Sequence, residues 1–118
     1  MQPKDAHTIL VVEDDHEIST KMENVLLQRG HEVLLASNAD KAMEMTEAHR
    51  PSMILTDLDM PTFASLMSRL REHRDFGKMV VAIIDINHPE VSDKTVKILG
   101  DFSQLDTLIA SLPASNIH

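Results

Sequence analysis

The sequence predicts one α/β domain in which a parallel β-sheet carries helices on both faces. Two observations support this fold class. Short, nearly continuous apolar runs alternate with longer stretches of helical spacing, and this alternation repeats regularly along the chain. Short apolar runs are typical of parallel strands, which are buried on both faces. A chain of 118 residues has room for a single such domain, spanning 1–118, and we expect its end, 114–118, to be frayed.

Each element has its own signal in chain order. Strands are expected at 8–12 (TILVV), 32–36 (EVLLA), 52–56 (SMILT) and 79–84 (MVVAII). Helices are expected at about 18–29, closed by Gly30; at 38–49, followed by Pro51; at 63–73; and from Ser103 to the stop at Pro113. The order strand, helix, strand indicates right-handed crossovers and therefore a parallel sheet.

The segment 85–99 admits two interpretations. In the first, 95–99 (TVKIL) is a fifth strand and the polar stretch before it is a loop or a single turn, so that the fourth helix is shortened or absent. In the second, 89–99 is a helix that ends at Gly100, because Val91, Thr95 and Ile98 share a face. The first interpretation is preferred because the second leaves only two residues for the last strand.

Composition narrows the classes of function. The formal net charge of -8 argues against direct binding to nucleic acid, since phosphate contacts need a basic surface. No apolar run reaches the roughly 18–20 residues that a membrane span requires, and the first residues have no signal-peptide character, so we expect a cytoplasmic protein. The absence of cysteine excludes disulfides and thiolate metal sites, and the scattered histidines are expected at the surface.

Acidic residues follow two of the expected strands. Glu13 and Asp14 come directly after the first strand, and Asp57 comes directly after the third. Ligands of doubly wound sheets bind beyond the carboxyl ends of the strands, so these three carboxylates are expected to converge there. Mg²⁺ prefers such oxygen ligands and would relieve their mutual repulsion. A carboxylate in this position is also commonly a helix N-cap, and Asp15 is expected to be one.

Two motifs resemble the receiver domain of two-component response regulators: ILVVEDD at 9–15 and MILTDLDMP at 53–61. The resemblance covers nearly the whole chain and implies a flavodoxin-like, five-stranded sheet with strand order 2-1-3-4-5. It also implies a sensor histidine kinase, a phosphotransfer protein or an unidentified protein as the partner. Such a domain is not an enzyme beyond self-catalysed phosphoryl transfer and autodephosphorylation.

The resemblance also assigns roles to site residues. Asp57 would be the phosphoacceptor, whose carboxylate attacks phosphorus to give an acyl phosphate. Mg²⁺ would be bound directly by Asp14, by Asp57 and by the backbone carbonyl of Asp59, and through water by Glu13.

Three positions depart from the family pattern. A Thr or Ser is expected at the end of the fourth strand, where this chain has Ile84. A Lys is expected at the end of the fifth strand, where the alignment places Gly100, and the switch aromatic becomes Ile98. The loop after Pro61 is also shorter than in the family. The sequence therefore predicts an atypical receiver with an intact acidic half and an impaired switch.

Two other functions fit parts of the sequence. The losses at Ile84 and Gly100 favour a phosphorylation-independent interaction module on the same fold. Asp57 and Asp59 also resemble the D-x-D motif of haloacid-dehalogenase-type phosphatases, in which the second Asp is a general acid. Met60 and Pro61 replace the Gly-Thr usual in that motif, which makes the phosphatase a minor alternative.

Overall fold

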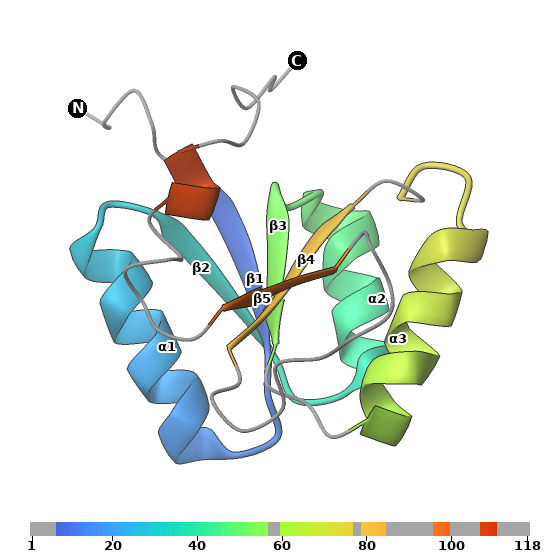
Figure 1. Ribbon diagram of the computed structural model, residues 1–118, viewed down its shortest axis with the longest axis horizontal. Coiled ribbons are helices and arrows are strands. Elements are labelled where there is room, and N and C mark those ends of the chain that lie inside the picture. The colour runs from blue at the N-terminus through green and yellow to red at the C-terminus, as the bar shows by residue number, and fades with distance from the viewer. Residues whose placement is uncertain (1–6, 57–59, 77–78, 85–95, 100–106, 111–118) are drawn as a thin grey trace.

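The structure is a computed structural model that describes residues 7–56, 60–76, 79–84, 96–99 and 107–110. The strands are β1 (Thr8–Val12), β2 (Glu32–Ala36), β3 (Met53–Thr56), β4 (Val80–Ile84) and β5 (Val96–Leu99), and the helices are α1 (His16–Gln28), α2 (Ala39–His49) and α3 (Met60–Glu72). Residues 107–110 are also helical. Strands and helices alternate as far as β4, so that neighbouring strands run in the same direction (Figure 1).

The strands form one parallel sheet in the order β2-β1-β3-β4-β5. β1 lies between β2 and β3, because Leu10 pairs with Leu34 on one side and with Ile54 on the other. The connection from β2 back across β1 to β3 is the point at which strand order reverses. In a doubly wound sheet that reversal positions a binding site at the carboxyl ends of the strands.

The two faces of the sheet bury separate apolar clusters, which explains why the strands are apolar at every position. On one face Ile9 and Val11 pack with Met22 and Leu26 of α1. The residues of the other cluster come from β1 to β4, from α2 and α3, and from the segment just after α3: Leu10, Val12, Ala36, Ala42, Met43, Ile54, Phe63, Leu66, Met67, Leu70, Phe76, Val81 and Ile83. Helices therefore cover both faces, as the sequence predicts (Figure 1).

Short polar residues define where α1 and α2 begin. The Asp15 side chain accepts hydrogen bonds from the backbone N–H groups of Glu17 and Ile18, so Asp15 is the N-cap of α1, as predicted. Asn38 caps α2 in the same way by accepting from the backbone N–H of Lys41 at 2.8 Å. Gly30 follows the end of α1 with φ of 86°, a left-handed conformation that glycine adopts without steric cost.

α3 begins earlier than predicted. The sequence indicated a loop through Pro61 and a helix from about residue 63, whereas the helix starts at Met60. Proline is tolerated in the first turn of a helix, because the first N–H groups have no intrahelical acceptor and the ring already holds a helical φ. Pro61 therefore belongs to the helix, and the short loop that was expected after it is the first turn of α3.

The last part of the sheet supports the first interpretation of 85–99. Residues 96–99 are strand β5, which pairs in parallel with β4, and they are not helical. The expected shortening of the fourth helix falls at 85–95, and the expected fraying falls at 114–118; both lie outside the described residues. Among the helices that the structure describes, none combines the length and the apolar character needed to cross a membrane.

Candidate functional site

The carboxyl ends of β1 and β3 lie side by side. Val12, the last residue of β1, pairs with Thr56, the last residue of β3, and Thr56 also pairs with Ile83 of β4. Glu13 directly follows Val12, and the fully buried Thr56 directly precedes Asp57. The register therefore brings to one edge of the sheet the two chain positions from which the predicted acidic residues emerge.

Glu13 is held in place by two backbone hydrogen bonds. Its N–H donates to the carbonyl oxygen of Ala36 at 3.0 Å, which extends the ladder between β1 and β2 by one residue. Its Oε1 accepts from the N–H of Asp15 at 3.0 Å. The residue is only 5% exposed. A carboxylate this buried is stabilised where a hydrogen-bond donor or a cation lies close to it.

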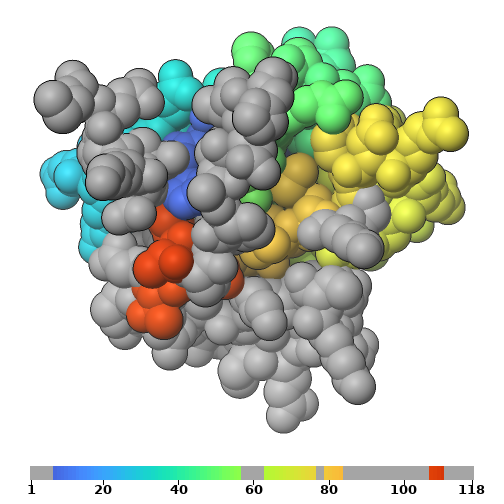
Figure 2. Space-filling model, turned by 90° about the horizontal axis from the view of Figure 1, so that it is seen from above, coloured from blue at the N-terminus to red at the C-terminus, as the bar shows by residue number. Residues whose placement is uncertain are grey.

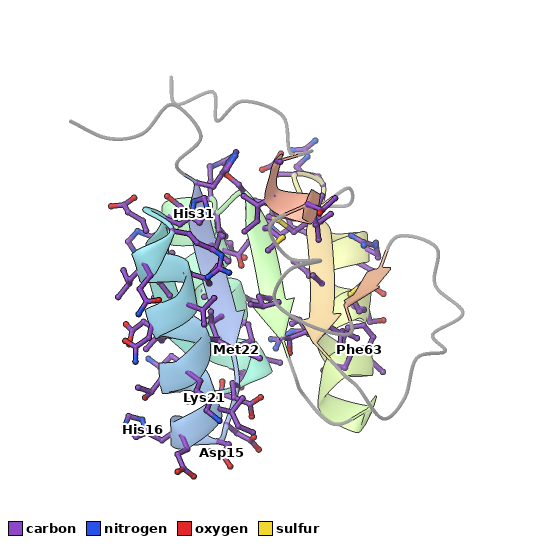
Figure 3. All side chains as sticks on the ribbon, turned by 60° about the vertical axis from the view of Figure 1, so that its left-hand side comes forward. Asp15, His16, Lys21, Met22, His31 and Phe63 are labelled. Carbon is purple, nitrogen blue, oxygen red and sulfur yellow. The ribbon has the colours of Figure 1, made fainter. Side chains whose placement is uncertain are left out.

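Asp14 and Asp15 differ in what their side chains do. Asp14 is exposed at the end of β1, whereas the side chain of Asp15 faces the first turn of α1, where it caps the helix. Figure 3 shows Asp15 and His16 at one end of the molecule and His31 at the other. Because Asp15 satisfies the helix N–H groups, Asp14 is not required as the cap.

Of the remaining predicted site residues, some lie outside the described residues and others lie in described strands. Asp57, Asp59 and Gly100 lie outside the described residues. Ile84 is the last residue of β4, and Ile98 lies within β5, where it pairs with Ile83. The chain therefore has an aliphatic residue at the end of its fourth strand, where the family pattern has a Thr or Ser hydroxyl.

The described residues hold two of the expected magnesium ligands, Asp14 and Glu13. No group of three metal-ligating side chains occurs within this described part. The expected set also includes Asp57 and Asp59, which lie beyond it. What is described fits Mg²⁺ chemically, because both available groups are carboxylates and Mg²⁺ takes oxygen ligands.

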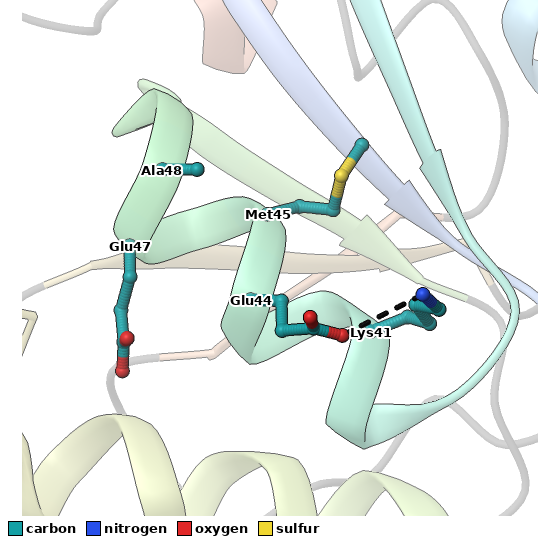
Figure 4. Close-up of a pocket in the computed structure, with 5 residues that line it drawn as sticks. All are labelled: Lys41, Glu44, Met45, Glu47 and Ala48. Carbon is teal, nitrogen blue, oxygen red and sulfur yellow. Dashed lines mark ion pairs between the residues drawn. The ribbon is translucent and has the colours of Figure 1, made fainter.

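One surface hollow lies on α2 and shares no residue with this site. It has a volume of about 470 Å³ and is lined by Lys41, Glu44, Met45, Glu47 and Ala48 (Figure 4). Lys41 and Glu44 form an exposed ion pair of 3.6 Å across it. All five residues belong to a single helix, so the hollow does not gather groups from several elements as a catalytic site does.

Two histidines contradict the expectation that all of them lie at the surface. His7 and His31 are buried near the start of the sheet, where the N–H of His7 donates to Nδ1 of His31 at 3.1 Å. Nδ1 of His7 lies 3.3 Å from Oγ of Ser52. These contacts join residues 24 and 45 positions apart, and no local pattern in the sequence indicates them.

The hydrogen bonds between the end of α3 and the residue before β4 were likewise not predicted. Both terminal nitrogens of Arg71 donate to the carbonyl oxygen of Met79, each at 3.3 Å. Seen from above, the end of α3 lies against β4 (Figure 2, yellow and gold). Arg71 therefore joins the end of the helix to the residue that precedes β4.

The fold and the acidic edge define a class: a doubly wound α/β domain with carboxylates at the point where strand order reverses. Residues 9–100 match the response regulator receiver domain family, so the chain belongs to that family. It is a receiver domain of two-component systems.

Particular relatives extend this result. The chain is 29% identical over 107 residues to the nitrogen assimilation regulatory protein NtrX of Azorhizobium caulinodans, covering 91% of this chain and 21% of NtrX. It is 30% identical over 94 residues to the nitrate/nitrite response regulator protein NarL of Escherichia coli, covering 76% of this chain and 43% of NarL. The chain thus spans less than half of each of these relatives.

A solved structure shows the same fold. The pseudo-receiver domain of the CikA protein has a TM-score of 0.73 at 24% identity, over 92% of this chain and 99% of that domain.

Proposed function

We propose that this receiver domain accepts a phosphoryl group on Asp57 in the presence of Mg²⁺, and that its switch is impaired. The observation that supports this most strongly is the register of Val12 with Thr56, since it starts the two acidic segments at one edge of the sheet. The family membership supports the same role. A solved receiver domain of a sensor histidine kinase from Pseudomonas aeruginosa has a magnesium ion coordinated in its active site cleft, and such a domain is the model for the metal here.

In this proposal Asp14, Asp57 and the backbone carbonyl of Asp59 hold Mg²⁺ directly, and Glu13 holds it through water. The metal supplies positive charge to the phosphoryl oxygens. A carboxylate oxygen of Asp57 attacks phosphorus, the bond from phosphorus to the donor's imidazole nitrogen breaks, and its electron pair stays on that nitrogen. The buried Glu13 is positioned for this role by the N–H of Asp15, which donates to its Oε1.

The impaired switch follows from the residues at the ends of β4 and β5. Ile84 offers no hydroxyl to a phosphoryl oxygen, and Gly100 offers no ammonium. Losing one such electrostatic partner commonly costs about 3–4 kcal/mol in a transition state, so we expect slow phosphorylation.

The phosphoacceptor is tested by incubating the chain with Mg²⁺ and acetyl phosphate and measuring acid-labile phosphate on the protein. Asp57→Asn should abolish the label. Asp59→Asn is the matched control, because it makes the same charge change but leaves the backbone carbonyl, and it should keep most of the label. Equal labelling of the Asp57→Asn protein and the unaltered chain would rule Asp57 out as the acceptor.

A second candidate function is a phosphorylation-independent interaction module. The aliphatic end of β4 favours it, because phosphorylation then has one contact fewer with which to move that strand end. The double variant Ile84→Thr with Gly100→Lys restores both family groups. If the first function holds, this variant should be labelled by acetyl phosphate at least tenfold faster than the unaltered chain. If its rate is unchanged, the interaction module becomes the better assignment.

A further inference from the structure

The outer edge of β2 carries backbone groups that the sheet does not use. β2 is the end strand of the sheet, and among the described residues it pairs with β1 alone. The N–H of Glu32 donates to His7 and the carbonyl of Ala36 accepts from Glu13, so Glu32, Leu34 and Ala36 face β1. Peptide groups of a strand alternate in direction. Val33 and Leu35 therefore present both their N–H and their C=O groups outward.

Among the described residues, the two large apolar side chains that are exposed both lie at this edge. Leu35 of β2 is 40% exposed, and Leu27 in the last turn of α1 is 51% exposed. Charged residues and prolines usually keep an edge strand from pairing with another chain. The stretch from Val33 to Ala36 contains neither.

A surface hollow lies at the other half of this edge. It has a volume of about 490 Å³ and is lined by residues that include Leu27, Val33 and Leu34, with His49 of α2. Leu35 is not among its lining residues. The edge thus has an apolar projection at one end and a hollow of mixed lining at the other, where Leu27, Val33 and Leu34 lie beside polar residues: Thr8, His31, Glu32 and His49.

We propose that β2 pairs antiparallel with β2 of a second copy of this chain, with the two-fold axis at Leu34. In this register Val33 lies opposite Leu35 of the second copy, and Leu35 lies opposite its Val33. Residues opposite each other in such positions exchange both hydrogen bonds, so four outward-facing residues form four hydrogen bonds. A shift of two residues would leave one outward residue of each strand without a partner, and a shift of one would oppose outward groups with inward ones.

The side chains and charges fit the same register. Leu35 of one copy reaches the position of Val33 in the other, where Leu27 and the hollow lie, and the two-fold axis makes this contact twice. Glu32 lies opposite Ala36, just before the start of α2. It shares the sheet face of Leu34 and Ala36, whose cluster includes residues of α2.

This placement brings an exposed carboxylate to the N-terminal end of a helix. That end carries partial positive charge, and its first turn holds Asp40, which pairs with Arg69, and Lys41, which pairs with Glu44. No two like charges face each other directly along the strands, so the strand charges allow a second copy at this edge, and Glu32 gains the helix end as a favourable neighbour.

Sedimentation equilibrium of the full chain tests the assembly, in 0.15 M salt because each copy carries a net charge of -8. The expected mass is twice 13.2 kDa at high protein concentration. Leu35→Lys should weaken the dimer at least tenfold although it lowers the net negative charge. Ala64→Lys, on the exposed side of α3, makes the same charge change and should leave the dimer constant unaltered.

Cysteine cross-linking tests the register, and the chain has no cysteine of its own. Leu34→Cys places two thiols across the axis with Cα atoms about 4.5 Å apart, within disulfide range. Val33→Cys places its pair about 8 Å apart, beyond that range. Mild oxidation should therefore link the first variant and not the second.

The proposal is overturned if the measured mass stays at 13.2 kDa up to a protein concentration of about 1 mM. A strand of another protein would then be the better candidate for pairing with this edge. A dimer unaffected by Leu35→Lys, or equal cross-linking at 33 and 34, overturns it as well. The cross-linking arm decides the question if Leu35→Lys fails to fold.

Discussion

Asp15 shows how one side chain fixes the boundary between the acidic edge and α1. Its carboxylate accepts from two N–H groups, those of Glu17 at 2.9 Å and Ile18 at 3.2 Å. Its own N–H donates to Glu13, so the same residue starts the helix and positions the buried carboxylate. Glu13 and Asp15 therefore play different parts: Asp15 caps α1, and Glu13 accepts from the Asp15 N–H.

Removing this cap should destabilise the domain measurably. Asp15→Ala leaves two N–H groups of α1 without their acceptor, and we expect a loss of about 1 kcal/mol in the free energy of unfolding. Urea denaturation followed by circular dichroism measures it. Asp15→Asn changes the charge equally but remains a good cap, so it should lose less than half as much. Equal losses in the two variants would mean that charge, not capping, is responsible.

His31 offers a second test on a buried hydrogen bond. His31→Ala removes the acceptor of the His7 N–H, and a buried donor left unsatisfied costs about 1–3 kcal/mol. His31→Asn places a side-chain oxygen near the position of Nδ1 and should recover at least half of that loss. Both values come from urea unfolding at pH 8. If Asn recovers nothing, the lost packing of the imidazole ring explains the effect instead.

At the scale of elements, apolar periodicity predicted the strands closely because it depends on local sequence alone. β1 and β2 have the predicted bounds, and β3 and β4 begin one residue later than expected. The start of α3 was predicted wrongly because Pro61 fits both a loop and a first helical turn. The pairing of His7 with His31 was not predicted, since periodicity carries no information about contacts 24 residues apart.

The candidate site was predictable in part for the same reason. Acidic residues after apolar runs indicated Glu13 and Asp14, and the strand register confirms that the ends of β1 and β3 are adjacent. The burial of Glu13 depends on the packing around it, which the sequence pattern does not encode. Asp57 stays a prediction, supported by family membership.

Along α2 and α3 and just beyond their C-terminal ends lie two ion pairs and one histidine–carboxylate contact. Asp40 pairs with Arg69 at 2.6 Å, and Glu47 pairs with His73 at 3.6 Å. The third joins Arg50, the left-handed cap residue of α2, to Asp75 at 3.7 Å. All three are at least partly exposed, so solvent screens them and each contributes little.

Neighbouring residues of α3 allow this to be tested directly. Arg69→Ala removes the shortest pair and should cost less than about 1 kcal/mol, and the loss should shrink in 1 M NaCl. Leu70→Ala empties a fully buried position of the core and should cost about 2–5 kcal/mol at either salt concentration. Thermal or urea unfolding gives both values. A larger loss from Arg69→Ala would show that these surface contacts, not the core, hold α3.

At the scale of the whole molecule, the proposed impairment of the switch predicts how far a phosphoryl signal should spread. Moving a two-state surface from mostly inactive to mostly active takes about 5 kcal/mol of differential affinity. Two missing hydrogen bonds, at about 1–3 kcal/mol each, are most of that amount. Signalling from Asp57 to the far end of the sheet should therefore be weak.

Beryllofluoride with Mg²⁺ provides the measurement, since it mimics the phosphoryl group in an NMR titration. Resonances of residues 57–62 should shift, and those of residues 85–112 should stay nearly constant. The Ile84→Thr, Gly100→Lys variant is the positive control and should spread the shifts. Equal shifts at both sets in the unaltered chain would falsify the impaired switch and point to Lys94 or Lys97 as the replacement.

β1 lies between two strands and between two apolar clusters, and this position determines the order in which backbone amides exchange their protons for deuterium. Its amide protons are held on both edges, and its side chains Ile9 to Val12 are fully buried. They should therefore exchange last, at the rate of global unfolding. Val33 and Leu35, whose N–H groups point away from the sheet, should exchange among the first in a lone chain. Slow exchange at those two amides alone would report a protective neighbour before any mass measurement is made.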